Sequence, residues 1–217
     1  MSVLSSLYNS SVGKKILMAA TGLLLCTYLV VHLAGNLLLF KNDNGEAFNT
    51  YAELLPSLLI IRIIEMLLFA IFAAHIVLGT IFWISNRSKR PEKYAMNRAV
   101  ENSSLFSRTM FVTGSIVFIF IFIHMSQFWG PSRFATGPVS MYTLVKTAFT
   151  NPMYALFYII SMVLVAFHLR HGFESALQTF GLSHQKYSQL IKIVGAIFWL
   201  VIPLLFAAMP IYFLLNS

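Results

Sequence analysis

Five long apolar stretches constrain the fold of this chain more than any other feature of its sequence. They cover residues 16–40, 56–84, 107–129, 152–178 and 190–215, and each reaches the roughly 20 residues that a helix needs to cross a bilayer. None of them alternates apolar with polar residues, as the strands of a membrane barrel would. The sequence therefore predicts an all-α integral membrane protein with five transmembrane helices, in one domain over residues 1–217.

Composition agrees with this prediction. The chain is 58% hydrophobic and only 10% charged, whereas soluble domains carry about a quarter charged residues. Its net charge of +8 comes without a basic stripe of interleaved aromatics, so no nucleic-acid partner is expected. The one cysteine, Cys26, matches neither a disulfide nor a metal-site spacing and is expected to be a core residue. The first apolar stretch is too long for a signal peptide and is expected to be a retained helix.

Basic residues in the loops predict the orientation in the membrane. Lys14 and Lys15 precede the first stretch, and Lys186 and Lys192 flank the loop before the fifth. The loop between the second and third stretches is the most basic, with Arg87, Lys89, Arg90, Lys93, Arg98 and Arg108. The opposite loops hold only Lys41, Arg133 and Lys146. The positive-inside rule therefore predicts a cytoplasmic N-terminus and a C-terminus on the outer side.

Each of the first four stretches carries a histidine, and the four fall at two depths. At a rise of 1.5 Å per residue, His32 and His124 lie roughly 24 Å from the cytoplasmic ends of their helices, and His75 and His168 only roughly 13 to 15 Å. His75 follows His32 by 43 residues, and His168 follows His124 by 44; His171 fits this spacing less well. The two hairpins are therefore predicted to form a weak internal repeat.

One imidazole from each of two helices, at each of two depths, is the arrangement required to ligate two b haems. Small residues could make room for the porphyrins. Gly79 and Gly172 lie four residues after the inner histidines, and Gly22 and Gly114 lie ten residues before the outer ones. Zinc ligands would have to converge on one point, which these depths forbid for all four histidines. The alternative is that the histidines only pack or form hydrogen bonds between helices.

The chain resembles a known family over nearly its whole length. The segments that carry the resemblance are "SSVGKKILMAATGLLL" leading into "HLAGNLLLF", "FAAHIVLGT", "FIFIHMSQFW" and "FHLRHGFESALQTFG". They are similar to the cytochrome b membrane anchor of succinate dehydrogenases and fumarate reductases, of the type with five helices and two haems in one polypeptide. The fourth helix is the most specific: it carries the family's ligand histidine, the glycine four residues on and an aromatic–glycine pair, here His168, Gly172 and Phe180–Gly181.

The resemblance implies a ligand scheme. The first four helices would form a bundle around two stacked haems, with His75 and His168 holding the inner one and His32 and His124 the outer one. His171 has no counterpart as a ligand.

The resemblance also implies partners and a location. The chain would anchor an FAD flavoprotein subunit and an iron–sulfur subunit to the bacterial inner membrane, as the membrane part of respiratory complex II in the tricarboxylic acid cycle. It would carry electrons between those subunits and quinone, with menaquinone favoured. Some fumarate reductases carry a glutamate two residues before the fourth-helix ligand; here that residue is Ala166, so that proton path is not carried over.

Four polar residues are candidates for quinone binding or proton transfer near the outer haem. Asn36 lies one helical turn after His32, and Arg62 and Glu65 are spaced to pair on the second helix. Glu53 lies in the preceding loop. Carboxylates there could take up or release the quinone protons. The alternative roles are a structural ion pair for Arg62 with Glu65 and a solvated charge for Glu53.

Haem propionates require cations or hydrogen-bond donors at the cytoplasmic end. Lys14, Lys15, Arg108, Arg170 and His171 are candidates. Membrane topology and anionic lipid head groups account for the same positive charges.

Two other functions stay open. The chain could be a dihaem, quinone-reactive anchor of a different dehydrogenase, such as a hydrogenase or formate enzyme, which the co-purifying soluble subunits would reveal. It could also be a haem-free transporter or proton channel that uses intramembrane histidines. Transporters often have broken helices, and Pro203 is the one clear proline inside a predicted span.

Overall fold

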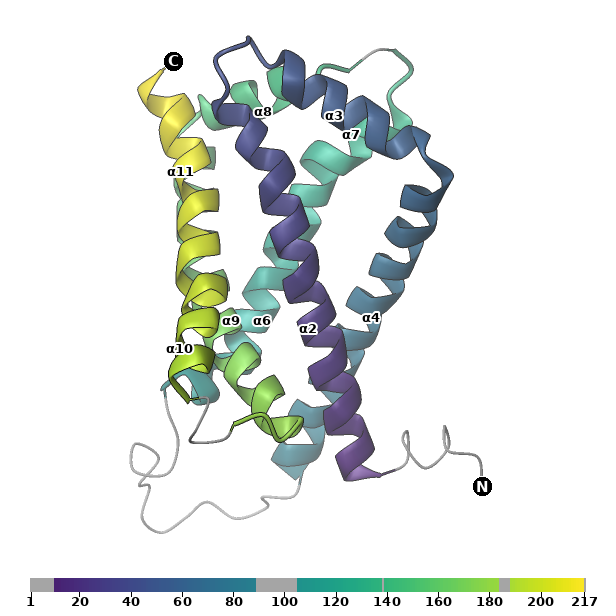
Figure 1. The fold of residues 1–217 in the computed structure, drawn as a ribbon, viewed down its shortest axis with the longest axis vertical. Coiled ribbons are helices and arrows are strands. Elements are labelled where there is room, and N and C mark those ends of the chain that lie inside the picture. Colours follow the sequence, from purple (N-terminus) through teal and green to yellow (C-terminus); the bar gives the residue numbers. More distant parts are fainter. Residues whose placement is uncertain (1–9, 89–104, 138, 184–187, 217) are drawn as a thin grey trace.

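The computed structural model describes residues 10–88, 105–137, 139–183 and 188–216, and every regular element in these ranges is helical (Figure 1). Five helical stretches are long and apolar enough to cross a membrane: Ser11–Phe40, Leu59–Ser88, Arg108–Phe134, Pro152–Thr179 and Ser188–Leu215. The prediction of an all-α protein with five transmembrane helices is therefore confirmed.

Two of the spans begin at side-chain caps. Helix α2 (Ser11–Asn36) starts where Ser10 Oγ accepts the Gly13 N–H at 2.9 Å. Helix α9 (Pro152–Thr179) starts after Asn151, whose Oδ1 accepts the N–H of Met153 at 3.0 Å and of Tyr154 at 3.2 Å. Such caps satisfy N–H groups that have no partner within the helix, and proline at the first helical position fits because it has no N–H.

The second span differs from its predicted bounds. Pro56 does not open it but lies inside α3 (Glu46–Ser57), and Leu58 is extended before α4 (Leu59–Ser88) begins. An apolar stretch alone cannot show this break, because residues on both sides of it are hydrophobic. The chain therefore turns between α3 and the span, at the end of the bundle that the loop charges predict to face outward. We call this end the outer end, and the opposite end the inner end.

Two spans contain a widened, π-helical turn. In the third span, η2 (Met125–Trp129) joins α6 (Leu105–His124) to α7 (Gly130–Phe134). In the fifth, η4 (Ile197–Val201) joins α10 (Ser188–Ala196) to α11 (Ile202–Leu215). Pro131 and Pro203 follow these turns by two residues. A proline ring clashes with the carbonyl four residues before it, and a wider turn relieves that clash, so both spans stay helical across their prolines.

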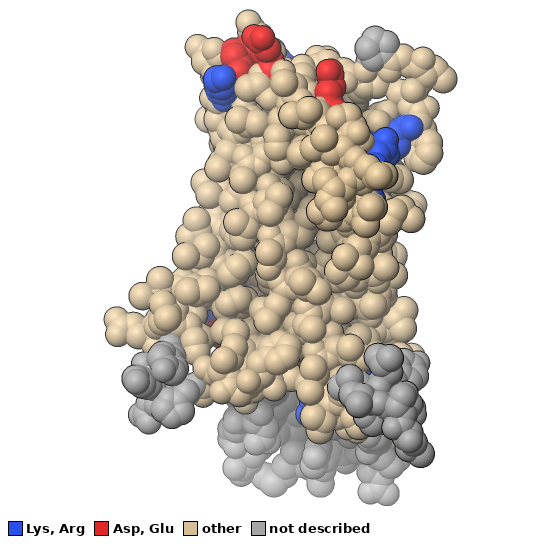
Figure 2. Space-filling view, turned by 45° about the vertical axis from the view of Figure 1, so that its right-hand side comes forward, with Lys and Arg blue, Asp and Glu red and all other residues tan. Residues whose placement is uncertain are grey.

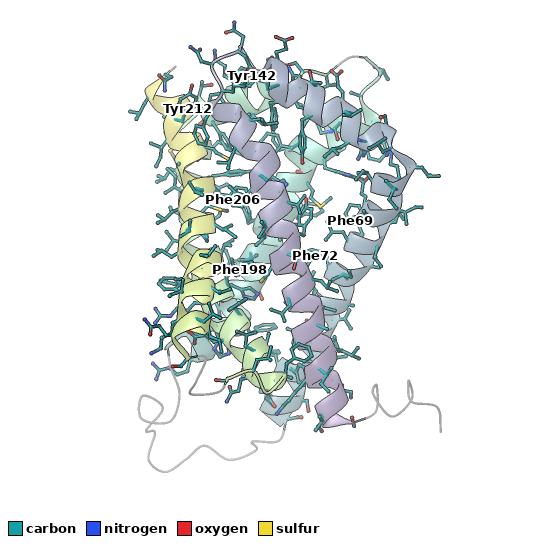
Figure 3. All side chains as sticks on the ribbon, in the orientation of Figure 1. Phe69, Phe72, Tyr142, Phe198, Phe206 and Tyr212 are labelled. Carbon is teal, nitrogen blue, oxygen red and sulfur yellow. The ribbon has the colours of Figure 1, made fainter. Side chains whose placement is uncertain are left out.

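Helix α9 is central to the packing of the spans. It contacts α6, α2 and α11, while α4 packs mainly on α2 and leans away from the other helices at its outer end (Figure 1). Phe198 and Phe206 point inward from the fifth span, as do Phe69 and Phe72 from α4 (Figure 3). Ile202, Met209 and Phe213 of α11 are buried in the main core. The fifth span is therefore an integral part of the bundle.

Two short helices that the sequence did not predict, α3 and α8 (Met141–Phe149), lie at the outer end, beside α7 at the end of the third span (Figure 1). Asn49 joins α3 to α8, because its Oδ1 accepts the Tyr142 N–H at 2.9 Å and its Nδ2 donates to Ser140 Oγ at 3.1 Å. Helix α8 buries Val145, Ala148 and Phe149 against the bundle.

The surface is consistent with a lipid environment. Figure 2 shows charged side chains gathered at the end that carries α3 and α8, above a broad and nearly uncharged belt. Large apolar side chains are exposed on all five spans, among them Leu24, Ile63, Phe122, Ile160 and Leu204. The start of α2, the end of α4 and the start of α10 share the opposite end (Figure 1). The basic residues Lys89, Arg90, Lys93, Arg98 and Lys186 lie outside the described residues, and the cytoplasmic assignment of that end stays a prediction.

The turn before α3 yields a first prediction. Gly45 has a φ of +83°, and the ring of Tyr142 occupies the place where a Cβ would lie. We expect Gly45→Ala to lower the free energy of unfolding by about 2 kcal/mol, because alanine is strained in this backbone conformation. Thermal unfolding in detergent measures the loss. Gly137→Ala is the control, since its Cβ would meet no atom within 4 Å; equal unfolding temperatures for the two variants would contradict the expectation.

Candidate functional site

The four predicted histidines lie in two pairs, each joining two helices. His32 of α2 faces His124 at the end of α6, with ring centres 5.8 Å apart and planes at 87°. His75 of α4 faces His168 of α9, with ring centres 6.3 Å apart and planes at 75°. Two imidazoles on opposite sides of one metal ion have ring centres roughly 6 Å apart, given metal–nitrogen bonds of about 2.0 Å. Both pairs are therefore spaced like axial ligands of one iron.

Two glycines let helix backbones approach the inner pair. A Cβ on Gly22 would lie 3.3 Å from His75 Cε1, and one on Gly114 would lie 3.1 Å from His168 Cε1. Both distances are shorter than ordinary van der Waals contacts, so larger residues would displace the rings. Each glycine thus lies against the inner histidine of the neighbouring helix in its own hairpin, α2 with α4 or α6 with α9. This is the depth expected from the sequence.

The other two predicted glycines face flexible side chains. A Cβ on Gly79 would lie 3.5 Å from Met18 Cε, and one on Gly172 would lie 3.5 Å from Met110 Cε. Methionine adapts to irregular space more readily than branched side chains do. The sequence had not singled out Met18 or Met110, but each lies four residues before Gly22 or Gly114, on the same helix face.

The Nδ1 atoms of the histidines differ in their surroundings. Three lie within hydrogen-bond distance of a hydroxyl: His75 with Thr21 at 3.2 Å, His32 with Tyr28 at 3.4 Å, and His124 with Tyr158 at 2.9 Å. In the described part of the chain, His168 Nδ1 is the one buried side-chain nitrogen or oxygen with no hydrogen-bond partner. A histidine that ligates a metal through Nε2 usually donates its Nδ1 proton to an oxygen acceptor, most often a carboxylate, a backbone carbonyl or water; a hydroxyl oxygen can accept the same proton.

These pairs do not form a metal site made of protein ligands alone. The described residues contain no group of three or more histidine, cysteine, aspartate or glutamate side chains that could hold an ion. Zinc and similar ions usually take three or four protein ligands. A haem needs only two, because the porphyrin supplies the other four nitrogens. The residues present therefore fit a haem better than a bare ion.

Glu65 is the centre of a second polar cluster, at the outer end. Its side chain is 16% exposed, and its closest cation is Arg133, with Nη2 2.8 Å from Oε2 and Nε 3.2 Å from Oε1. The Trp129 indole also donates to Oε1. Arg62, which the sequence paired with Glu65, lies at 4.0 Å and is 50% exposed. The expected Arg62 pair is thus the weaker one, and sequence reasoning missed Arg133 because it lies 68 residues away.

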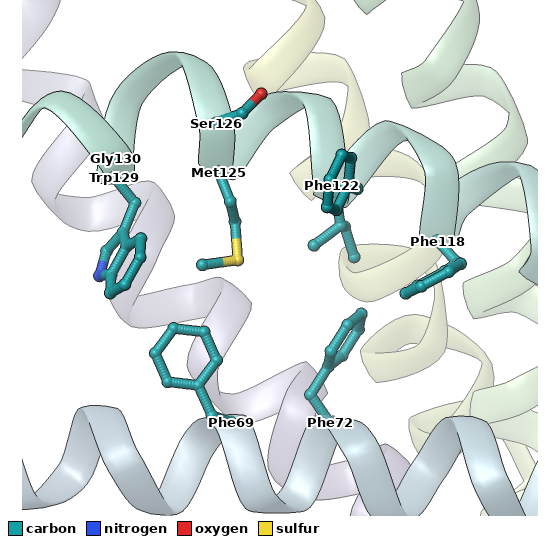
Figure 4. A pocket seen from close by; sticks show the side chains of 9 residues that line it. Phe69, Phe72, Phe118, Phe122, Met125, Ser126, Trp129 and Gly130 are labelled. Atoms are coloured by element: carbon teal, nitrogen blue, oxygen red, sulfur yellow. The ribbon is translucent and has the colours of Figure 1, made fainter.

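An apolar cavity of about 360 Å³ lies beside this cluster, between α4 and the third span (Figure 4). Phe69 and Phe72 line it from α4, facing Phe118 and Phe122 of α6. Ile121, Met125, Ser126, Trp129 and Gly130 complete the lining. Trp129 belongs both to the lining and to the Glu65 cluster, so the carboxylate lies next to one end of the cavity. Met125 and Ser126 directly follow His124 in the chain, so the cavity lies at a depth close to that of the outer histidine pair, although neither of these histidines lines it.

The remaining candidates near the outer pair have other surroundings. Asn36 Nδ2 donates to the backbone carbonyl of His32 at 2.8 Å, so it is bonded within its own helix. Glu53 is exposed on α3, in keeping with a solvated charge.

At the inner end, Arg170 lies over the ring of Trp199 at 4.8 Å. It is two residues from His168 and therefore points to a different side of α9, toward the fifth span. His171 and Lys14 are half-buried in α9 and α2. A haem propionate contact for these three residues stays a prediction.

Comparison with known proteins identified no relative. No protein-family model, curated protein or solved structure matches the chain.

The Glu65 cluster yields a second prediction. We expect Arg133→Gln to lower the free energy of unfolding by about 2 kcal/mol, because it leaves a largely buried carboxylate without its main cation. Arg62→Gln should cost less than about 1 kcal/mol, as exposed ion pairs do. Thermal unfolding of the two variants in the same detergent measures both effects. If Arg62→Gln lowered the free energy of unfolding more than Arg133→Gln, Arg62 would be the main partner of Glu65, as the sequence predicted.

Proposed function

We propose that this chain is a dihaem cytochrome b that anchors the flavoprotein and iron–sulfur subunits of a succinate dehydrogenase or fumarate reductase in the bacterial inner membrane. The two histidine pairs, each joining two helices at one of two depths, are the observation that carries the proposal. His75 and His168 would hold the inner b haem, and His32 and His124 the outer one. When bound, the two haems supply one-electron transfer across the membrane.

The residues around the four histidines would position the two haems. Gly22 and Gly114 leave room beside the inner rings, and hydroxyls at three of the four Nδ1 atoms leave the corresponding Nε2 atoms free to bind iron. The fourth, His168 Nδ1, is buried without a partner. A buried unpaired nitrogen is costly, and ligation through Nε2 would offset that cost. The hydroxyl contacts of His32, His75 and His124 are compatible with ligation through Nε2, which supports the proposal for these three rings.

The aromatic cavity would bind quinone. A slot lined by apolar and aromatic side chains with one polar end suits a quinone ring, and the Glu65 cluster provides that end. Oxidation of a quinol releases two electrons and two protons, so a carboxylate beside the cavity can accept a proton as electrons pass to the outer pair. The family resemblance favours menaquinone. Of the four quinone candidates from the sequence, Glu65 is the one best supported by the geometry.

The partners of the chain follow from the resemblance. The FAD and iron–sulfur subunits would bind at the inner end, where the second loop is basic, and would carry out the dicarboxylate chemistry. Membrane lipid would surround the spans. The five spans are helical through their middles, without the unwound segments that transporters use at their binding sites. This continuity favours the cytochrome over the transporter.

Haem content tests the ligand scheme. We expect the purified complex to show two b haems per chain in a pyridine haemochrome assay, reducible by succinate when the soluble subunits are present. His168→Ala should remove one of the two spectral signals, because it removes an axial ligand, and His171→Ala should keep both. Two haems that do not respond to succinate would move the chain to another dehydrogenase. Absence of haem from the wild type would overturn the proposal and favour the transporter.

The quinone site makes a separate prediction. We expect Glu65→Gln to lower the rate of electron transfer between succinate and a menaquinone analogue at least tenfold, because the amide cannot accept the proton. Both haem spectra should be unchanged, as should succinate oxidation with an artificial acceptor. Glu53→Gln serves as the matched control and should keep the quinone rate. Loss of that rate in Glu53→Gln but not in Glu65→Gln would place the quinone site at α3 instead.

A further inference from the structure

Among the described residues, Tyr158 makes the shortest hydrogen bond to a ring nitrogen of the four histidines. Its side chain is 5% exposed, and its hydroxyl lies 2.9 Å from His124 Nδ1. The Tyr154 hydroxyl donates to it from the previous turn of α9 at 3.5 Å. A buried tyrosine hydroxyl needs hydrogen-bond partners, and the structure places two beside it, His124 Nδ1 and the Tyr154 hydroxyl.

The ring of Tyr158 is held on several sides. Phe120 of α6 and Phe149 of α8 pack edge-on against it, with ring centres at 5.0 and 4.9 Å. Phe128 of η2 packs similarly at 6.3 Å. Because a tyrosine has only two side-chain torsions, these contacts leave the hydroxyl little freedom to leave Nδ1. The orientation of His124 therefore depends on α8 and α9 as well as on residues of its own span.

The contacts at the other histidines are weaker. Tyr28 lies at 3.4 Å from His32, Thr21 at 3.2 Å from His75, and His168 has no partner. The Thr21 hydroxyl also donates to backbone carbonyls of its own helix, at 2.9 and 3.0 Å. Tyr158 is therefore the one hydroxyl among the three that is both fully buried and close.

The direction of the hydrogen bond determines which nitrogen can bind a metal. A neutral imidazole carries one proton, so a proton on Nδ1 leaves the lone pair on Nε2 free. A phenol oxygen can accept two hydrogen bonds, one from Nδ1 and one from the Tyr154 hydroxyl. Donation from Nδ1 makes a ligating imidazole more electron-rich, which favours the oxidised form of the metal.

We propose that Tyr158 is a positioning residue for the outer haem: its hydroxyl oxygen accepts the Nδ1 proton of His124 and fixes the tautomer that presents Nε2 to iron. Tyr154 supports it by donating to the same oxygen. This inference rests on the proposed function, because it presumes that His124 is a haem ligand. It assigns a role to a residue that neither spacing nor family resemblance singled out.

Redox titration of the wild type and of Tyr158→Phe tests the proposal. Phenylalanine keeps the ring and removes only the hydroxyl. We expect the midpoint potential of one of the two b haems to become more positive, and its low-spin electron paramagnetic resonance signal to shift, with the other haem unchanged. Tyr154→Phe should shift the same haem by less. Tyr212→Phe, on α11 away from the histidines, should shift neither.

The possible outcomes separate the two proposals. No haem in the wild type overturns the proposed function and this inference with it. Two haems in the wild type, with both potentials and both resonance signals unchanged in Tyr158→Phe, overturn the role of Tyr158 alone. Loss of only the outer haem from Tyr158→Phe, at an unchanged unfolding temperature, supports positioning. Loss of both haems with a lowered unfolding temperature would show that the hydroxyl serves packing, and would overturn the inference.

Discussion

The approach of a glycine backbone to a histidine ring, made once in each hairpin, is the contact on which the rest of this structure depends. Gly22 of α2 lies against His75 of α4, and Gly114 of α6 lies against His168 of α9. In lipid there is little hydrophobic force between helices, so close van der Waals packing at small residues must hold them together. A larger residue at either position would separate the helices of that hairpin. The inner imidazoles would then no longer face each other at the bundle centre.

The two hairpins repeat their inner contacts and differ at the level of the outer histidines. Gly22 and Gly114 are 92 residues apart, and His75 and His168 are 93 apart, and the Met18 and Met110 contacts repeat as well. Glu65 and Tyr158 also correspond, since each lies ten residues before the inner histidine of its helix. One provides a carboxylate beside a cavity and the other a hydroxyl beside His124. The same position in the repeat thus provides two different polar groups at the outer level.

The five spans and the depths of the histidines could be predicted from the sequence. The side-chain partners of Glu65 and His124 and the short outer helices could not. Hydropathy and helical rise give depth, so the five spans and the two histidine levels followed from counting residues. Depth does not give the direction in which a side chain points, so Arg133 and Tyr158 were missed as partners of Glu65 and His124. The ten-residue spacing shared by Glu65 and Tyr158 was the available signal. Helices α3 and α8 were missed because they lie across the bundle end and carry no long apolar run.

The π-helical turn η2 has a consequence for the alignment of the outer end. A π turn holds one more residue than an α-helical turn, and one residue corresponds to a rotation of about 100° around a helix axis. From the end of this turn, at Trp129, the residues are therefore rotated relative to the face that carries His124. This rotation brings the Trp129 indole and the Arg133 guanidinium onto the side of α4, where Glu65 lies. A single extra residue thus allows one span to present an imidazole to the bundle centre and, five and nine residues later, two hydrogen-bond donors to a neighbouring helix.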